Sequence, residues 1–91
     1  MNMVYSLEIS KAADEKFGKM AKKDRKRLVI VGKKIAQILQ NPYHFKPLSN
    51  EMHGIRRVHV DTSFVLTYEI DEARKTVCVL DFEHHDKAYC R

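Results

Sequence analysis

The sequence lacks the features of disulfide-rich, secreted and membrane-spanning proteins. Its 91 residues include only two cysteines, Cys78 and Cys90, and this pair makes neither a disulfide framework nor a C-x-x-C metal motif. We expect both thiols to be reduced and Cys78 to be buried as a small apolar side chain. No apolar run approaches the roughly 18 residues of a transmembrane helix, and no signal-peptide core follows Met1. We therefore expect a soluble, cytoplasmic protein without a membrane partner.

Tryptophan is absent, glycine and proline are scarce, and the chain contains no repeat and no low-complexity segment. Hydrophobic residues make up 44 % of the sequence and charged residues 32 %, which is the composition of an ordinary globular protein. This composition and the short length predict a single small domain over residues 1–91.

Acidic residues are scarce in the first third of the chain, where the charge is strongly positive. Residues 1–34 carry ten Lys or Arg and four Asp or Glu, whereas residues 35–91 carry seven and eight. Nine of the basic residues lie between Lys16 and Lys34, with Asp24 as the one acid among them. This excess predicts an anionic partner: nucleic acid, an anionic membrane or an acidic protein. The alternative is that the lysines only keep a helix solvated.

The first forty residues predict one strand and two helices. Apolar and polar residues alternate over Val4–Ile9, which is typical of a half-buried strand. Ser10 is a suitable N-cap for a helix over residues 11 to about 21, and Asp24 is one for a second helix that ends near residue 40. Apolar residues recur at helical spacing in both helices, so each helix must bury one side against the strands.

The second half of the chain predicts three strands joined by tight turns. Asn41-Pro42 ends the second helix, because the residue before a proline disfavours helical geometry, and residues 41–54 form a loop. Strand-like runs then cover Ile55–Val60, Phe64–Ile70 and Thr76–Phe82. Such short connections imply antiparallel pairing. The order β-α-α-β-β-β predicts an α+β fold: a mostly antiparallel sheet, both helices on one face, and a short C-terminal helix.

Strand alternation sorts the polar residues of Ile55–Val60 between the two faces of the sheet. Arg57 and His59 share one face, and Arg56 and Val58 share the other. Helices on one face leave the other face open, where a histidine beside an arginine can accept a phosphate. Solvated polar side chains on an open sheet face fit the same pattern.

Four segments carry a resemblance to a known family. They are Lys46-Pro47-Leu48, Gly54 to Val60, Phe64 to Tyr68, and the ending His84-His85-Asp86-Lys87-Ala88-Tyr89. With them, and with its order of elements, the chain resembles the RelE/ParE superfamily of toxins from toxin–antitoxin systems, and most closely the YafQ-type messenger-RNA interferases. The resemblance implies a RelE-like microbial RNase fold. It also implies a cognate antitoxin protein as partner and messenger RNA, usually on the ribosome, as substrate.

The resemblance also implies a catalytic set. His59 stands in the family's Arg-x-x-His-Val pattern, His85 precedes Tyr89 by four residues as a catalytic histidine does, and Lys46 replaces a histidine before Pro-Leu. Metal-free RNA cleavage requires a base, an acid and cations for the charge that builds on phosphorus. We therefore expect His59 and His85 to form the acid–base pair, in either order, and Lys46 to help neutralise the phosphate. The expected catalytic residues are His59, His85, Lys46 and Tyr89.

A second set is expected to bind the substrate. Arg56 and Arg57 would contact the phosphate, and Phe64, or else Tyr89, would stack on an unpaired base. Ser63 takes the place of an acidic residue that is usual in the family. The expected substrate-binding residues are Arg56, Arg57, Phe64 and Ser63.

One departure from the family pattern leaves an alternative function open. Asp81 stands four residues before His85, where these toxins carry an arginine, and an acid there repels a phosphate unless it orients a histidine. The alternative function is a non-enzymatic protein of the same fold, either a gyrase-poisoning toxin or a degenerate toxin that only binds its antitoxin or RNA.

Neither a metal nor a cofactor is expected, because the adjacent His84 and His85 point apart and no cysteine pair completes a zinc site with His59.

Overall fold

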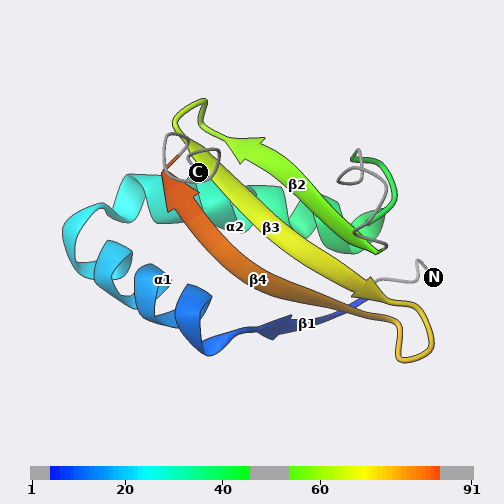
Figure 1. Cartoon of the computed structure of the whole chain (residues 1–91). Coiled ribbons are helices and arrows are strands. Elements are labelled where there is room, and N and C mark those ends of the chain that lie inside the picture. The colour runs from blue at the N-terminus through cyan, green and yellow to red at the C-terminus, as the bar shows by residue number, and fades with distance from the viewer. Residues whose placement is uncertain (1–4, 46–53, 85–91) are drawn as a thin grey trace, which may run out of the picture.

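The computed structural model describes residues 5–45 and 54–84, and it shows a four-stranded sheet with two helices on one face (Figure 1). The elements in chain order are β1 (Ser6–Ile9), α1 (Lys11–Lys23), α2 (Arg25–Gln40), β2 (Ile55–Val60), β3 (Phe64–Asp71) and β4 (Thr76–His84). This arrangement confirms the predicted α+β class and the position of both helices. The predicted C-terminal helix lies outside the described residues.

The sheet is mixed, with the strand order β1-β4-β3-β2. β2, β3 and β4 are neighbours along the chain and pair antiparallel through short turns, as the sequence predicted. β1 instead pairs with β4 in parallel, from Ser6 opposite Thr76 to Ile9 opposite Val79. A parallel pair requires a long connection, and both helices and two strands lie between β1 and β4.

Both helices begin at the predicted capping residues. The Ser10 hydroxyl accepts a 3.0 Å hydrogen bond from the Ala13 N–H, and it donates to the Leu80 carbonyl of β4 at 2.6 Å. Asp24 caps α2 by accepting from the Arg27 N–H at 3.1 Å. A capping side chain of this kind stabilises a helix by about 1 kcal/mol. Because Ser10 also bonds to β4, it fixes where α1 starts relative to the sheet.

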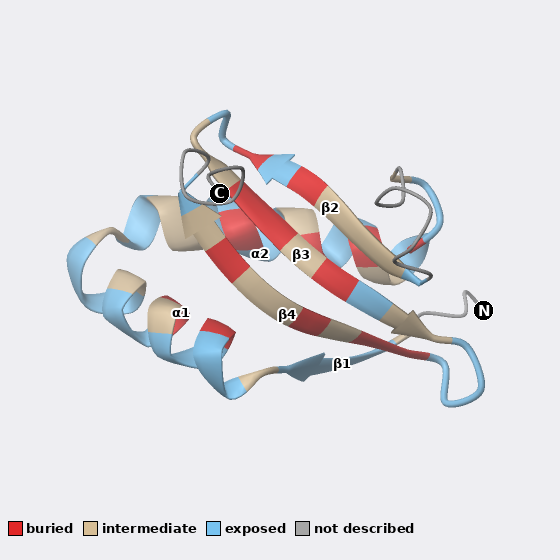
Figure 2. Cartoon of the chain, viewed as in Figure 1, coloured by how far each residue is buried: buried red, intermediate tan, exposed pale blue. Residues whose placement is uncertain are grey.

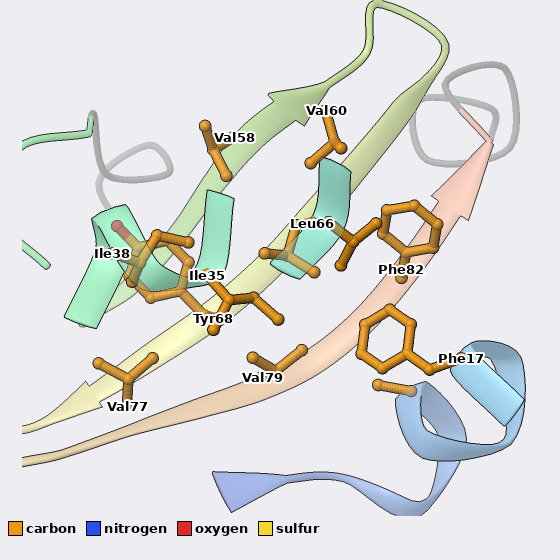
Figure 3. Close-up of a cluster of buried hydrophobic side chains, with 12 residues drawn as sticks. Phe17, Ile35, Ile38, Val58, Val60, Leu66, Tyr68, Val77, Val79 and Phe82 are labelled. Carbon is orange, nitrogen blue, oxygen red and sulfur yellow. The ribbon is translucent and has the colours of Figure 1, made fainter. Parts of the chain in front are cut away.

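The core fills the space between the helices and one face of the sheet (Figure 3). Phe17 of α1 lies against the ring of Phe82 in β4, with the ring centroids 5.5 Å apart. Ile35 and Ile38 of α2 pack in the same cluster, together with Tyr68, which is fully buried. The remaining buried members are Ala13, Val31, Val58, Val60, Leu66, Val77 and Val79. Neither helix of residues 5–45 and 54–84 is long and apolar enough to cross a membrane.

Three local predictions were wrong. β1 is not half-buried: all of Ser6–Ile9 is exposed, because the helices pack over β2 to β4 and leave this edge strand uncovered (Figure 2). Cys78 is half-buried rather than buried, because it lies on the sheet face opposite α1 and α2, where its thiol contacts Glu8. β4 also continues two residues beyond Phe82, so His84 is part of the strand and pairs opposite Phe64.

Candidate functional site

The candidate site lies on the sheet face opposite α1 and α2, which is turned toward the viewer in Figure 1. On β2, Val58 and Val60 are buried toward the helices, whereas His59 is exposed on the opposite face. Arg57 is two residues from His59 and therefore points to the same side. The structure thus brings these two predicted site residues together, as strand alternation predicted.

The cross-strand register places two carboxylates of β4 in the same rows as this pair. Arg57, Thr67 and Asp81 lie in one row across β2, β3 and β4, and His59, Val65 and Glu83 lie in the next. A bulge shifts the register between β3 and β4 at Thr67, and it leaves Leu80 without an opposite residue. A pocket of about 220 Å³ opens on this face and is lined by Arg57, Val65, Thr67, Asp81 and Glu83.

Lys16 of α1 holds both carboxylates of this pocket. Its Nζ lies 2.8 Å from Oδ1 of Asp81 and 3.7 Å from Oε2 of Glu83. Partial burial works to raise the pKa of Asp81, but hydrogen bonds from Lys16 and from the Phe82 N–H outweigh burial and lower this pKa below its usual value. Asp81 is therefore ionised at neutral pH. Sequence reasoning missed Lys16, because nothing local to a helical lysine indicates a contact 65 residues away.

The structure does not bring Arg56 to the same site. Its guanidinium lies on the helix side, where it donates to the carbonyl of Phe45 and sits 5.1 Å from the ring centroid of Tyr43. Arg56 thus fastens the segment after α2 to β2. Its expected role as a phosphate contact stays a prediction, and it would act from the opposite face of the sheet to Arg57, as strand alternation predicted.

Phe64 and Ser63 lie at the turn between β2 and β3. Phe64 faces the helices, and its ring stacks on Phe82 with the centroids 5.0 Å apart. The guanidinium carbon of Arg27 in α2 lies 4.6 Å from the centroid of the Phe64 ring, and Arg27 pairs with Asp61 of the turn at 3.4 Å. Phe64 therefore lies on the opposite side of the sheet from Arg57 and His59.

A second, larger pocket opens on this helix side, at the end of β4. Its volume is about 390 Å³, and its lining residues are Lys16, Lys19, Met20, Phe64, Phe82, Glu83 and His84. The His84 ring meets Phe64 edge-on, with the centroids 5.4 Å apart. Any base that stacks on Phe64 would have to enter from this side.

The remaining predicted residues, His85, Lys46 and Tyr89, lie outside the described residues. The expected spacing of His59 and His85 therefore stays a prediction. Within residues 5–45 and 54–84, no group of three or more His, Cys, Asp or Glu side chains is placed to hold a metal ion.

This fold, with two helices on one face of a four-stranded mixed sheet, recurs in solved bacterial toxins. The RelBE2 toxin–antitoxin complex of Mycobacterium tuberculosis contains a chain that matches with a TM-score of 0.74 and 22% identity, over 93% of this chain and 95% of that chain. The intact Escherichia coli RelBE toxin–antitoxin complex contains one that matches with a TM-score of 0.73 and 18% identity, over 86% and 93%.

Sequence comparison leads to the same class. A family model described as "ParE toxin of type II toxin-antitoxin system, parDE" matches residues 7–89. The protein named putative toxin RelE4, from Methanocaldococcus jannaschii, is 43% identical over 86 residues, which cover 94% of this chain and 92% of that protein. The chain therefore belongs to the ParE toxin family of type II toxin–antitoxin systems, within the RelE/ParE superfamily.

Proposed function

We propose that this toxin inhibits translation by cleaving messenger RNA, on the ribosome, through metal-free acid–base catalysis. The observation that carries the proposal is that His59 and Arg57 lie side by side on the sheet face opposite α1 and α2. Histidine exchanges protons near neutral pH, and a guanidinium binds phosphate through directed hydrogen bonds. The two side chains thus supply a proton-transfer group and an anion contact at one accessible place.

The second proton-transfer group in this proposal is His85, as in the YafQ-type arrangement. One histidine removes the proton of the ribose 2′-hydroxyl and the other protonates the 5′-oxygen that leaves. Lys46 adds positive charge, and Tyr89 stacks on a base. A proton-transfer residue of this kind typically contributes about 10²–10⁴-fold to the rate.

The proposed regulator is a cognate antitoxin protein. Two of the solved structures with this fold are toxin–antitoxin complexes. This chain carries a net charge of +5, and an acidic antitoxin segment would complement its basic helices. Co-purification of the toxin with a tagged antitoxin from the neighbouring reading frame tests this partnership.

The proposal is tested by producing the toxin in bacterial cells and measuring growth and the cleavage of translated messenger RNA. His59→Ala and His85→Ala should each abolish both effects and leave antitoxin binding intact. The matched control is His44→Ala, which changes an exposed histidine in the segment after α2 and should keep full toxicity. Full toxicity of the double variant His59→Ala, His85→Ala would refute the nuclease mechanism.

A specific observation favours a second candidate, a non-enzymatic toxin. Asp81 and Glu83 place two carboxylates in the pocket that Arg57 lines, and carboxylates repel a phosphate. A gyrase-poisoning relative would need no acid–base pair. Growth arrest without messenger-RNA cleavage, together with a loss of DNA supercoiling activity by purified gyrase, would support this candidate instead.

A further inference from the structure

Lys16 extends from α1 to the end of β4, at a level of the sheet that lies beyond the end of β1. β1 ends at Ile9, which is opposite Val79. Beyond Val79, β4 therefore pairs with β3 alone among the described strands. The Lys16 ammonium lies there, 2.8 Å from Asp81 and 3.7 Å from Glu83. Lys16 thus bridges α1 to two acidic residues of one strand.

These two acids belong to the lining of the pocket on the open face. Arg57 is the one basic residue among the described lining residues, so the lining alone carries one positive and two negative charges. The described lining residues alone would therefore present a net negative charge to a phosphate in this pocket. The ammonium of Lys16 adds the second positive charge, directly at the carboxylates that would repel the phosphate.

We propose that Lys16 is a positioning residue for phosphate binding. By neutralising Asp81 and Glu83, it allows the pocket lined by Arg57 to hold a phosphate group of single-stranded RNA. This inference rests on the proposed function and deepens it: α1 supplies a charge that the sheet face needs in order to take an anionic substrate. The competing explanation is purely structural, a salt bridge that only ties α1 to β4.

The test is a double-mutant cycle that measures the affinity of purified toxin for a short fluorescein-labelled single-stranded RNA. Lys16→Gln should weaken binding, and adding Asp81→Asn should restore it. The side chains of Lys16 and Asp81 are 41 % and 36 % exposed, which keeps their coupling modest. The factor by which Asp81→Asn raises the affinity should therefore be about two to five times larger in the Lys16→Gln background than in the wild type. Lys16→Arg, which keeps the charge, should bind as the wild type does.

The matched control is Lys22→Gln, which removes one exposed lysine from the same helix. The effects of Lys22→Gln and Asp81→Asn on the binding free energy should be additive. Lys22→Gln removes the same charge as Lys16→Gln but breaks no ion pair with Asp81. Equal coupling at both positions would overturn the inference, and so would a Lys16→Gln variant that loses thermal stability but binds RNA as the wild type does.

Arg57→Gln separates this inference from the proposed function. If Arg57→Gln weakens RNA binding while Lys16 and Asp81 show no coupling, the inference is wrong and the proposed function stands. If the wild type and Arg57→Gln bind RNA equally, the pocket takes no phosphate, which contradicts both. Measuring the pKa of Asp81 by NMR gives a readout without RNA: it should lie below the usual value in the wild type and rise in Lys16→Gln.

Discussion

Tyr43 donates a 2.6 Å hydrogen bond to Glu72, and this bond joins the segment after α2 to the turn between β3 and β4. Tyr5 donates to the same carboxylate oxygen at 2.8 Å, and Lys75 pairs with the other oxygen. The hydrogen bonds from Lys75, Tyr43 and Tyr5 lower the pKa of Glu72 from 4.5 to about 2. One ionised carboxylate thus joins segments from three parts of the chain.

Glu72→Gln should remove a stabilisation that depends on pH. Because the folded state lowers the pKa of Glu72, the stabilisation is fully present above the ordinary value of 4.5 and is lost as the pH falls to about 2. The wild type should therefore unfold at higher urea concentration than Glu72→Gln at neutral pH, and the difference should vanish toward pH 2. Glu69→Gln, which changes an exposed acid of β3, is the control, and an equal pH dependence of both variants would contradict the prediction.

Tyr68→Phe should destabilise the core through one lost hydrogen bond. Tyr68 is fully buried, and its hydroxyl donates to the carbonyl of Pro42 at 2.7 Å. Removing the donor leaves a buried carbonyl without this partner, which costs about 1–2 kcal/mol. Urea unfolding should show a lower midpoint with an unchanged slope. A variant as stable as the wild type would mean that water replaces the hydroxyl.

Thr62→Asn should stabilise the toxin. Thr62 has a φ of 57° in the turn between β2 and β3, and this left-handed conformation is unfavourable for a branched side chain. Asparagine tolerates it better, so we expect a gain of about 1 kcal/mol in the free energy of unfolding. Ser63→Asn is the control, since Ser63 does not have a positive φ and should gain nothing. A thermal or urea unfolding experiment measures both variants.

The basic hairpin of α1 and α2 should contribute to RNA binding through bulk charge. Lys22, Lys23 and Lys26 are exposed, and no described residue forms a salt bridge with them. Replacing all three by Gln should lower the affinity for single-stranded RNA. It should also reduce the slope of log K against log salt by up to about 2, because each phosphate contact contributes roughly 0.7.

The control for this prediction is Arg74→Gln, at the turn between β3 and β4, which lies at the opposite end of the molecule from the connection between α1 and α2 in Figure 1. Arg74 is salt-bridged to Glu8 and Asp71, so its charge is already compensated. A slope unchanged in the triple lysine variant, or reduced equally by Arg74→Gln, would place the RNA contacts elsewhere.

The sequence by itself determined the local elements. The caps at Ser10 and Asp24 and the alternation that puts Arg57 beside His59 are all properties of a few contiguous residues. A capping oxygen reaches N–H groups three residues away, and a strand turns alternate residues to opposite faces, so no distant contact was needed. For the same reason the three C-terminal strands and their antiparallel pairing were predictable.

Only the tertiary structure decided which side chains meet across the chain. It pairs β1 with β4 in parallel, turns Arg56 to the carbonyl of Phe45, and carries Lys16 to Asp81. Each of these contacts depends on how the helices are docked on the sheet, which local periodicity does not specify. The charge of the candidate site therefore follows from the packing of α1 against the end of β4, where the first strand has already ended and an extended lysine can reach two acids at once.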